Sequence, residues 1–138
     1  MQLSNNDMRT GGIVMFSDIL IIKPEWCDAI LCEGKCWEIR GQSTKKRGII
    51  GLAKTGTGKV YGECNIIDCI ALDRNLFETN RVNHHLPYTW EQLLKMFPKP
   101  YAWVLKDEDS KLYDEPLPFD YPKGAVAWVK YKGDATDS

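Results

Sequence analysis

The sequence predicts one mixed α+β domain built on a small curled sheet. Five or six short apolar segments are separated by glycine, proline and polar turn signals, which is typical of strands. Two segments, one early and one late, carry apolar residues at helical spacing. The chain has 138 residues, 43% hydrophobic and 27% charged, which suits a single globular domain with its own core. We assign residues 18–132 to this domain, with residues 1–17 and 133–138 as tails.

The first half of the domain is predicted to run strand, helix, strand and hairpin. Residues 18–23 (DILIIK) form an apolar strand, and Pro24 then starts a helix, since its missing N–H costs nothing in the first turn. The helix is expected to end at Gly34, because glycine favours the left-handed position after a helix. A further apolar strand spans residues 48–54, and residues 55–58 (TGTG) form a hairpin turn.

The second half alternates strands with one helix. Residues 60–72 predict a long strand that bends near Gly62, and residues 73–88 a polar connection. Thr89 is a suitable N-cap for a helix over residues 90–97, with a glutamine three positions later that completes a capping box. Three further extended segments complete the sheet: residues 101–106, 111–121 and 125–131.

Charge and hydropathy restrict the compartment and the partners. No apolar run approaches the ~18–20 residues of a membrane helix. The early apolar cluster at residues 13–16 is too short for the core of a signal peptide, so we expect a cytoplasmic protein without a membrane partner. The net charge of −1 combines a basic region, residues 23–59 with eight Lys/Arg and four Asp/Glu, with an acidic one, residues 107–138 with four Lys and eight Asp/Glu. Such a surface suits a polyanion site on one side, without the basic excess of a general nucleic-acid binder.

The cysteines and histidines do not form a metal pattern. Five cysteines, an odd number without a secretory signal, argue against a disulfide framework. Their spacings lack the Cys-x-x-Cys knuckle of a zinc site, and the adjacent His84 and His85 would point in different directions. We therefore expect free thiols, no metal and no cofactor.

The segment with the strongest chemical signal is residues 34–40 (GKCWEIR), at the junction between the first helix and the next strand. Strand alternation places Trp37 and Ile39 on one face and the charged Glu38 and Arg40 on the other. Charges of both signs at such a junction suit the wall of a pocket. The alternative is a solvated ion pair on the outer face of an edge strand, worth about 0–1 kcal/mol.

This Lys-x-x-Glu-x-Arg motif, after a glycine and a strand–proline–helix unit, resembles the signature of the ASCH family, a branch of the PUA-like β-barrels. The resemblance covers about residues 18–132, and includes Lys23-Pro24, the glycine-rich hairpin, Gly62-Glu63 and the YAWVL and PKGAVAWV segments. One departure is that Gly34 lies one place closer to the lysine than the family pattern has it. The resemblance implies a small PUA-like β-barrel of five to six strands with two or more flanking helices, and a cleft lined by the lysine, the glutamate and the arginine.

The resemblance also implies RNA or modified bases as ligands. PUA-like relatives bind such ligands, and some ASCH members are enzymes, one branch hydrolysing the amide of N4-acetylcytidine and another described as a ribonuclease. The amidohydrolase branch uses a threonine nucleophile three residues after the lysine, and here Glu38 takes that place. A carboxylate does not reproduce this hydroxyl chemistry, although Lys35 and Glu63 match that branch's lysine and glutamate. Cys36 is a possible substitute nucleophile without a nearby histidine to activate it.

Our first hypothesis is a module that binds RNA or a modified nucleoside. A base would stack on an aromatic side chain, which is worth about 1–3 kcal/mol, while Glu38 accepts from a base amino group and basic side chains meet phosphates. The candidate ligand-binding residues are Lys23, Lys35, Trp37, Glu38, Arg40, Lys45, Lys46, Arg47, Tyr61 and Trp103, with Trp128 as a further stacking candidate. For the tryptophans the alternative is a core position, and for the loop of residues 41–47 it is a solvated turn.

Two other functions stay open. In a hydrolase acting on a modified nucleoside or RNA, Glu38 or Glu63 would be the general base and Lys35 would stabilise the oxyanion. In a protein-interaction adaptor, the acidic C-terminal region would form the contact. Glu63 interrupts an apolar strand and needs a partner, for which we expect Arg40 or Lys35.

Overall fold

The structure, a computed structural model, describes residues 14–122, 124 and 127–132. Residues 1–13 of the predicted N-terminal tail and the whole predicted C-terminal tail, residues 133–138, lie outside the described residues. Phe16, which precedes the predicted start of the domain, is buried, and its ring packs directly over Gly51. The core therefore includes a side chain that precedes residue 18.

Seven strands form one mixed sheet in the order β2-β5-β4-β3-β1-β7, with β6 paired to β4 off this path. The β1–β3 pair is parallel and the other pairs are antiparallel. The predicted α+β class is confirmed, with seven strands where five to six were expected. The ladder runs from β2 to β7 without closing on itself within the described residues, so the sheet is curled and open. The strands are β1 (Asp18–Ile22), β2 (Trp37–Arg40), β3 (Gly48–Lys54), β4 (Lys59–Ala71), β5 (Tyr101–Leu105), β6 (Lys111–Pro118) and β7 (Trp128–Lys130).

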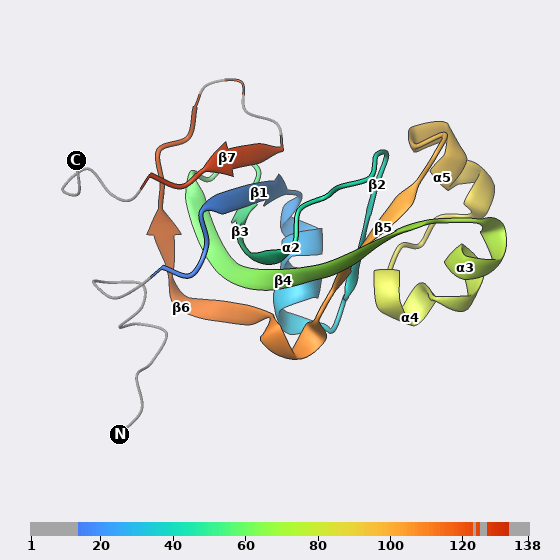
Figure 1. Cartoon of the computed structure of the whole chain (residues 1–138), viewed down its shortest axis with the longest axis horizontal. Coiled ribbons are helices and arrows are strands. Elements are labelled where there is room, and N and C mark those ends of the chain that lie inside the picture. The colour runs from blue at the N-terminus through green and yellow to red at the C-terminus, as the bar shows by residue number, and fades with distance from the viewer. Residues whose placement is uncertain (1–13, 123, 125–126, 133–138) are drawn as a thin grey trace.

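Strand β4 organises the sheet. Its 13 residues pair with β3 on one edge, and with β6 and then β5 on the other. The register against β6 shifts between Val60 and Gly62, which confirms the bend predicted there. Figure 1 shows β4 extending from the β6 end of the molecule to the helices at the opposite end.

Helix α2 (Pro24–Cys32) begins at its proline and packs one face on the sheet through Cys27, Ala29 and Ile30. The chain leaves the helix through Gly34, whose φ of +80° is the left-handed conformation that glycine adopts without strain. The predicted helix end is thereby confirmed. The amide of Lys35 then donates back to the carbonyl oxygen of Ala29 at 3.0 Å, so the lysine is tied to the helix end before β2 begins.

The predicted polar connection over residues 73–88 was wrong in part, because it contains two short helices, α3 (Arg74–Thr79) and α4 (Arg81–His84). The Asp73 carboxylate caps α3 by accepting from the Leu76 amide at 2.8 Å. Phe77 supplies the apolar anchor and is fully buried. A single buried side chain in six residues leaves too little helical periodicity for detection from the sequence.

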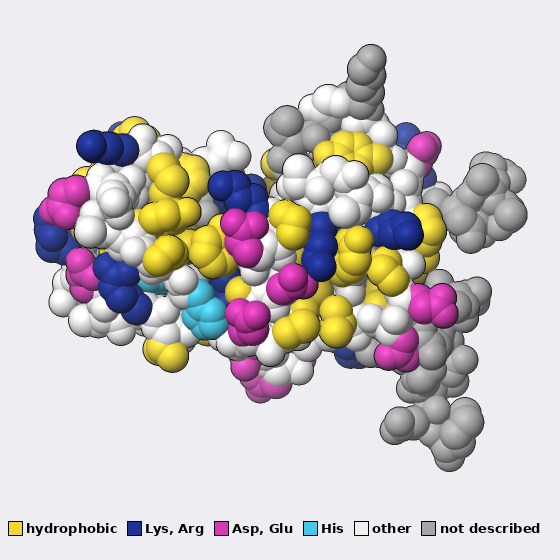
Figure 2. All heavy atoms as spheres, turned by 180° about the vertical axis from the view of Figure 1, so that it is seen from behind, with side chains coloured by type: hydrophobic (Ala, Val, Ile, Leu, Met, Phe, Trp, Pro, Cys, Tyr) yellow, Lys and Arg dark blue, Asp and Glu magenta, His cyan; other side chains and the backbone are white. Residues whose placement is uncertain are grey.

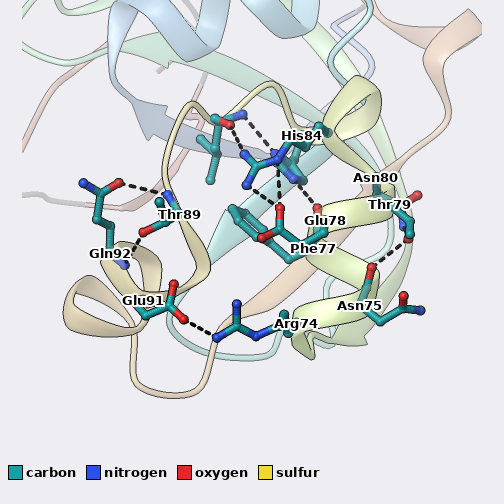
Figure 3. Close-up of polar contacts among 12 residues, drawn as sticks. Arg74, Asn75, Phe77, Glu78, Thr79, Asn80, His84, Thr89, Glu91 and Gln92 are labelled. Carbon is teal, nitrogen blue, oxygen red and sulfur yellow. Dashed lines mark hydrogen bonds and ion pairs between the residues drawn. The ribbon is translucent and has the colours of Figure 1, made fainter.

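Helix α5 (Trp90–Met96) has the capping box predicted for it. The Thr89 hydroxyl accepts from the Gln92 amide at 3.1 Å, and the Gln92 side chain accepts from the Thr89 amide at 2.9 Å. Figure 3 shows this box together with an ion pair between Arg74 of α3 and Glu91 of α5. The three short helices thus form a connected group at one end of the sheet (Figure 1).

Strand β2 lies between two parts of the core. Trp37 and Ile39 pack with Phe77, Leu86 and Leu93 from the helical group, which confirms the predicted apolar face. A second cluster lies between α2 and the sheet, and a third contains Phe16 and Tyr113. The charged residues of β2, Glu38 and Arg40, line a cavity with residues from the end of β1 and the start of α2.

Candidate functional site

A cavity of about 330 Å³ lies where the end of β1, the start of α2, β2 and the segment around α5 meet. This volume is in the range of sites for small molecules. Most of the lining is apolar or aromatic, and its charged members are Lys23, Glu38 and Arg40. The complete lining is Ile21, Ile22, Lys23, Trp26, Glu38, Ile39, Arg40, Thr55, Leu86, Tyr88, Met96 and Phe97.

Glu38 is the buried charge of this cavity, with 5% of its surface exposed. Its Oε2 accepts from Arg40 Nε at 2.9 Å, and its Oε1 lies 3.8 Å from Lys35 Nζ. Pairing with Trp103 of β5 fixes the position of Glu38 on the strand. A buried carboxylate is costly unless it is paired, and here a cation lies beside each oxygen. The predicted convergence of the lysine, the glutamate and the arginine is present.

Lys35 supports Glu38 from inside the protein. Its side chain is fully buried, and Nζ donates to the carbonyl oxygens of Trp37 at 2.8 Å and His84 at 2.5 Å. The ammonium also lies 5.1 Å from the centroid of the Trp26 ring, which lines the cavity. Burial lowers the pKa of Lys35 to about 8, although the neighbouring Glu38 carboxylate acts in the opposite direction. Lys35 therefore holds two cavity-lining side chains in place.

Arg40 connects the cavity to a second hollow of about 380 Å³. Besides its bond to Glu38, its guanidinium donates to the carbonyl oxygen of Ile21 at 3.5 Å and lies 5.4 Å from the centroid of the Trp103 ring. The second hollow is lined by Arg40, Gly41, Gln42, Met96, Phe97, Pro98, Trp103, Ala127 and Trp128.

The basic loop after β2 has local partners. Lys46 Nζ donates to Asp18 Oδ2 at 2.8 Å and lies 5.1 Å from the centroid of the Trp128 ring. Arg47 donates to the carbonyl oxygens of Thr44 and Lys46, and Lys45 is exposed. Of these three candidates, Lys46 is the one that lies beside the second hollow.

The aromatic candidates separate into different places. Trp37 is buried in the core, and Tyr61 is half-buried under the Lys54 ammonium, 4.3 Å from the ring centroid. Trp103 is 2% exposed and stacks on the half-buried Trp128, with ring centroids 5.9 Å apart and planes 13° apart. Trp103 and Trp128 therefore contribute to the second hollow, while Trp37 and Tyr61 belong to neither lining.

The expected partner of Glu63 was wrong. Its carboxylate accepts from the Tyr113 hydroxyl at 2.7 Å, and not from Arg40 or Lys35. Glu63 lies opposite Gly51 in the β3–β4 register, so its side chain shares the sheet face on which Phe16 packs. The next residue, Cys64, points to the face covered by α2. Strand alternation thus separates Glu63 from the charged motif of β2.

The sequence reasoning missed most of the aromatic wall. Trp26, Tyr88 and Phe97 line the cavity from three separate segments. None of the three was among the candidate ligand-binding residues, and Phe97 entered only as the last residue of the predicted helix over residues 90–97. Contacts between segments that are distant in the sequence bring these side chains together, and the spacing of residues along the chain does not predict such contacts.

His84 is a further residue that the sequence did not single out. Its ring stacks on Phe77 with centroids 4.4 Å apart. Figure 3 labels both residues. Nδ1 accepts from the Leu86 amide at 2.9 Å, so the proton of the neutral ring lies on Nε2, 2.8 Å from the Phe77 carbonyl oxygen. Burial lowers the pKa of His84. Because its own carbonyl oxygen accepts from Lys35, His84 links the helical group to the charged motif.

Comparison with known proteins places this geometry in a known fold. No family model and no curated protein matches the chain in sequence. Crystal structures of the ASCH protein from Zymomonas mobilis match with a TM-score of 0.61 at 18% identity, over 87% of this chain and 90% of that one. A serine-to-alanine mutant of that protein matches with a TM-score of 0.63 at 19% identity, over 87% of this chain and 91% of that one. A tyrosine-to-phenylalanine mutant matches with a TM-score of 0.59 at 18% identity, over 87% of this chain and 93% of that one.

The chain has the ASCH fold. The family resemblance of the motif is therefore borne out in the architecture. The coverage shows that the likeness spans nearly the whole domain and extends well beyond the motif. At below 20% identity the likeness concerns the fold, and the chemistry of the cavity has to be argued from this chain's own residues.

Two further findings concern metals and membranes. Within residues 14–122, 124 and 127–132, no three His, Cys, Asp or Glu side chains are grouped so that they could hold a metal ion. No helix in the same part of the chain is long and apolar enough to cross a membrane. On the face drawn in Figure 2, lysine and arginine side chains are interspersed with acidic ones.

Proposed function

We propose that this ASCH-fold domain binds a single unstacked base, of RNA or of a modified nucleoside, in the cavity that contains Glu38 and Arg40. The observation that carries the proposal is a buried carboxylate facing an aromatic cavity. Glu38 would accept from an amino or imino group of the base, and Arg40 would donate to a carbonyl oxygen or a phosphate. The rings of Trp26, Tyr88 and Phe97 supply flat surfaces for stacking.

The support of Glu38 by two cations explains why it suits recognition. Arg40 and Lys35 each lie beside one oxygen of the carboxylate, and a carboxylate offers hydrogen-bond acceptors only. An acceptor with a fixed direction discriminates base edges by their donors, and a good bidentate pair is worth about 1–3 kcal/mol. Pre-organisation by Lys35 would reduce the entropy lost on binding.

The hydrolase hypothesis receives less support. Lys35, its oxyanion-stabilising candidate, donates to two backbone carbonyl oxygens inside the protein. Glu63 bonds to Tyr113 on another face of the sheet. Thr55 contributes a hydroxyl to the cavity, and this hydroxyl donates to the carbonyl oxygen of Ile22 at 3.1 Å. We therefore propose binding as the function of this site.

The test is a thermal-shift screen of natural and modified nucleosides and short RNAs, followed by titration of each hit. We expect Glu38→Gln to weaken binding of the best base by at least about tenfold, equivalent to about 1.4 kcal/mol. The matched control is Glu33→Gln, which makes the same change at an exposed residue beyond α2 and should leave the affinity unchanged.

Mass analysis of the incubated mixture separates binding from turnover. Accumulation of a product that depends on Glu38 would favour the hydrolase hypothesis. If circular dichroism shows that Glu38→Gln is folded and its affinity equals that of the parent, the proposed role of the carboxylate is wrong.

A further inference from the structure

The cavity with Glu38 and the second hollow share one wall. Arg40, Met96 and Phe97 line both of them. The cavity has a volume of about 330 Å³ and the second hollow has a similar volume of about 380 Å³. Among the described residues, Glu38 is the acidic side chain that lines the cavity, whereas Arg40 is the charged side chain that lines the second hollow. A ligand that fills both would need two bulky parts joined at Arg40, with its negative charge near that residue.

The second hollow suits a flat ring. Trp103 and Trp128 stack almost parallel, and the half-buried Trp128 is the outer ring of the pair. Lys46 Nζ lies 5.1 Å from the centroid of the Trp128 ring, which adds positive charge beside this stack. Aromatic platforms next to basic side chains are typical of sites for single-stranded nucleic acid.

Arg40 is placed to meet the group between the two parts. Its Nε donates to Glu38 and its Nη2 to the carbonyl oxygen of Ile21. A guanidinium group carries five N–H donors, so hydrogens beyond these two bonds can serve an anion at the shared wall. A phosphodiester has the charge and the oxygen geometry that an arginine binds best.

We infer that the ligand is a nucleic-acid strand with at least two adjacent nucleotides. One base occupies the cavity with Glu38, its neighbour stacks on Trp128 in the second hollow, and the phosphodiester between them lies at Arg40. The inference rests on the proposed function and deepens it, because it selects single-stranded nucleic acid over a free nucleoside.

The experiment measures the affinity of the protein for one base as a nucleoside, as a nucleotide and as part of a dinucleotide. The probes are the preferred nucleoside, its 5′- and 3′-monophosphates, and dinucleoside monophosphates that carry it at either end, in ribose and deoxyribose forms. We expect one dinucleoside monophosphate to bind about tenfold or more tightly than the nucleoside. Trp128→Ala should remove this gain while the nucleoside affinity stays unchanged.

A second variant guards against misfolding, since Trp128 lies in β7 and packs on the core. Gln42 is exposed and lines the second hollow, so Gln42→Glu adds a negative charge beside the expected phosphate. This variant should weaken dinucleotide binding severalfold and leave nucleoside binding intact. Ser43→Glu adds the same negative charge one residue further along the loop, at an exposed position outside the lining, and should have a smaller effect.

The outcomes separate this inference from the function on which it rests. If the nucleoside binds in a Glu38-dependent way and no dinucleotide binds more tightly, the inference is wrong and the base site remains. The same holds if a monophosphate reproduces the full gain, because the second hollow is then unused, or if Gln42→Glu and Ser43→Glu act equally. If neither nucleosides nor dinucleotides bind, the proposed function fails as well.

Discussion

The ammonium group of Lys35 lies 3.8 Å from the carboxylate of Glu38 and reaches it from inside the protein. A ligand would approach the same carboxylate from the cavity. Glu38 is thus paired inside the protein and lines the cavity as well, and under the proposed function the two roles can be separated by experiments on its supporting lysine.

Lys35→Met should lower the free energy of unfolding by about 3 kcal/mol. The change leaves the buried carbonyl oxygens of Trp37 and His84 without their donor and removes one of the two cations beside Glu38. Urea denaturation measures the loss. Lys54→Met is the control, since Lys54 forms a partly exposed pair with Asp28 at 2.9 Å and should cost less than about 1 kcal/mol. If the two variants lost the same free energy of unfolding, the conclusion that the buried Lys35 stabilises the fold more than a surface lysine does would be contradicted.

Acid should destabilise the fold through His84. Burial lowers its pKa from 6.5, and the charges of Lys35 and Arg81 act in the same direction. The unfolded chain then binds this proton more readily than the native one, so the free energy of unfolding falls as the pH drops below about 6.5. Above that pH the His84 ring is neutral in both the native and the unfolded state, so its contribution to the free energy of unfolding is fully retained.

Denaturation between about pH 7 and pH 5 measures this effect above the range in which most carboxylates titrate. His84→Gln should flatten the pH dependence in this window. His85→Asn should preserve it, because His85 is less buried and asparagine tolerates its positive φ of 63°. An unchanged slope in His84→Gln would assign the acid sensitivity to another group.

Local sequence rules were sufficient where neighbours along the chain determine the structure. Strand alternation placed Trp37 and Glu38 on opposite faces, Gly34 ended α2, and the Thr89 capping box began α5. Each of these features depends on hydrogen bonds or side-chain directions within about four residues. The charged half of the site lies in one such segment, and this is why it could be predicted.

The remaining parts depend on contacts between distant segments. The partner of Glu63 is Tyr113, 50 residues away, and β6 has to pair with β4 before the two meet. The aromatic wall joins Trp26 of α2 to Tyr88 and Phe97 around α5. A hydrophobic pattern shows that such side chains are buried or half-buried but does not show which of them share a cavity.

Tyr113→Phe should cost about 1–3 kcal/mol of unfolding free energy, because the nearly buried Glu63 carboxylate loses its 2.7 Å hydrogen bond. Thermal or urea denaturation measures the change, with Tyr61→Phe as a half-buried control that should stay within about 0.5 kcal/mol. Base affinity at the Glu38 cavity should be unaffected in the folded Tyr113→Phe protein. A large loss of affinity would instead connect Glu63 to the ligand, as the hydrolase hypothesis requires.

Gly41→Ala should weaken ligand binding through Phe97. A Cβ atom at Gly41 would lie 2.8 Å from Phe97 Cδ1, so the ring has to move, and this ring lines both hollows. We expect the base affinity to fall about fivefold, equivalent to about 1 kcal/mol of lost stacking. The mechanism is tested by a double-mutant cycle with Phe97→Ala, measured by titration with the preferred base. If the displaced ring is the cause, Gly41→Ala has no further effect once Phe97 is truncated. Additive losses would show that Gly41 acts on the ligand by another route.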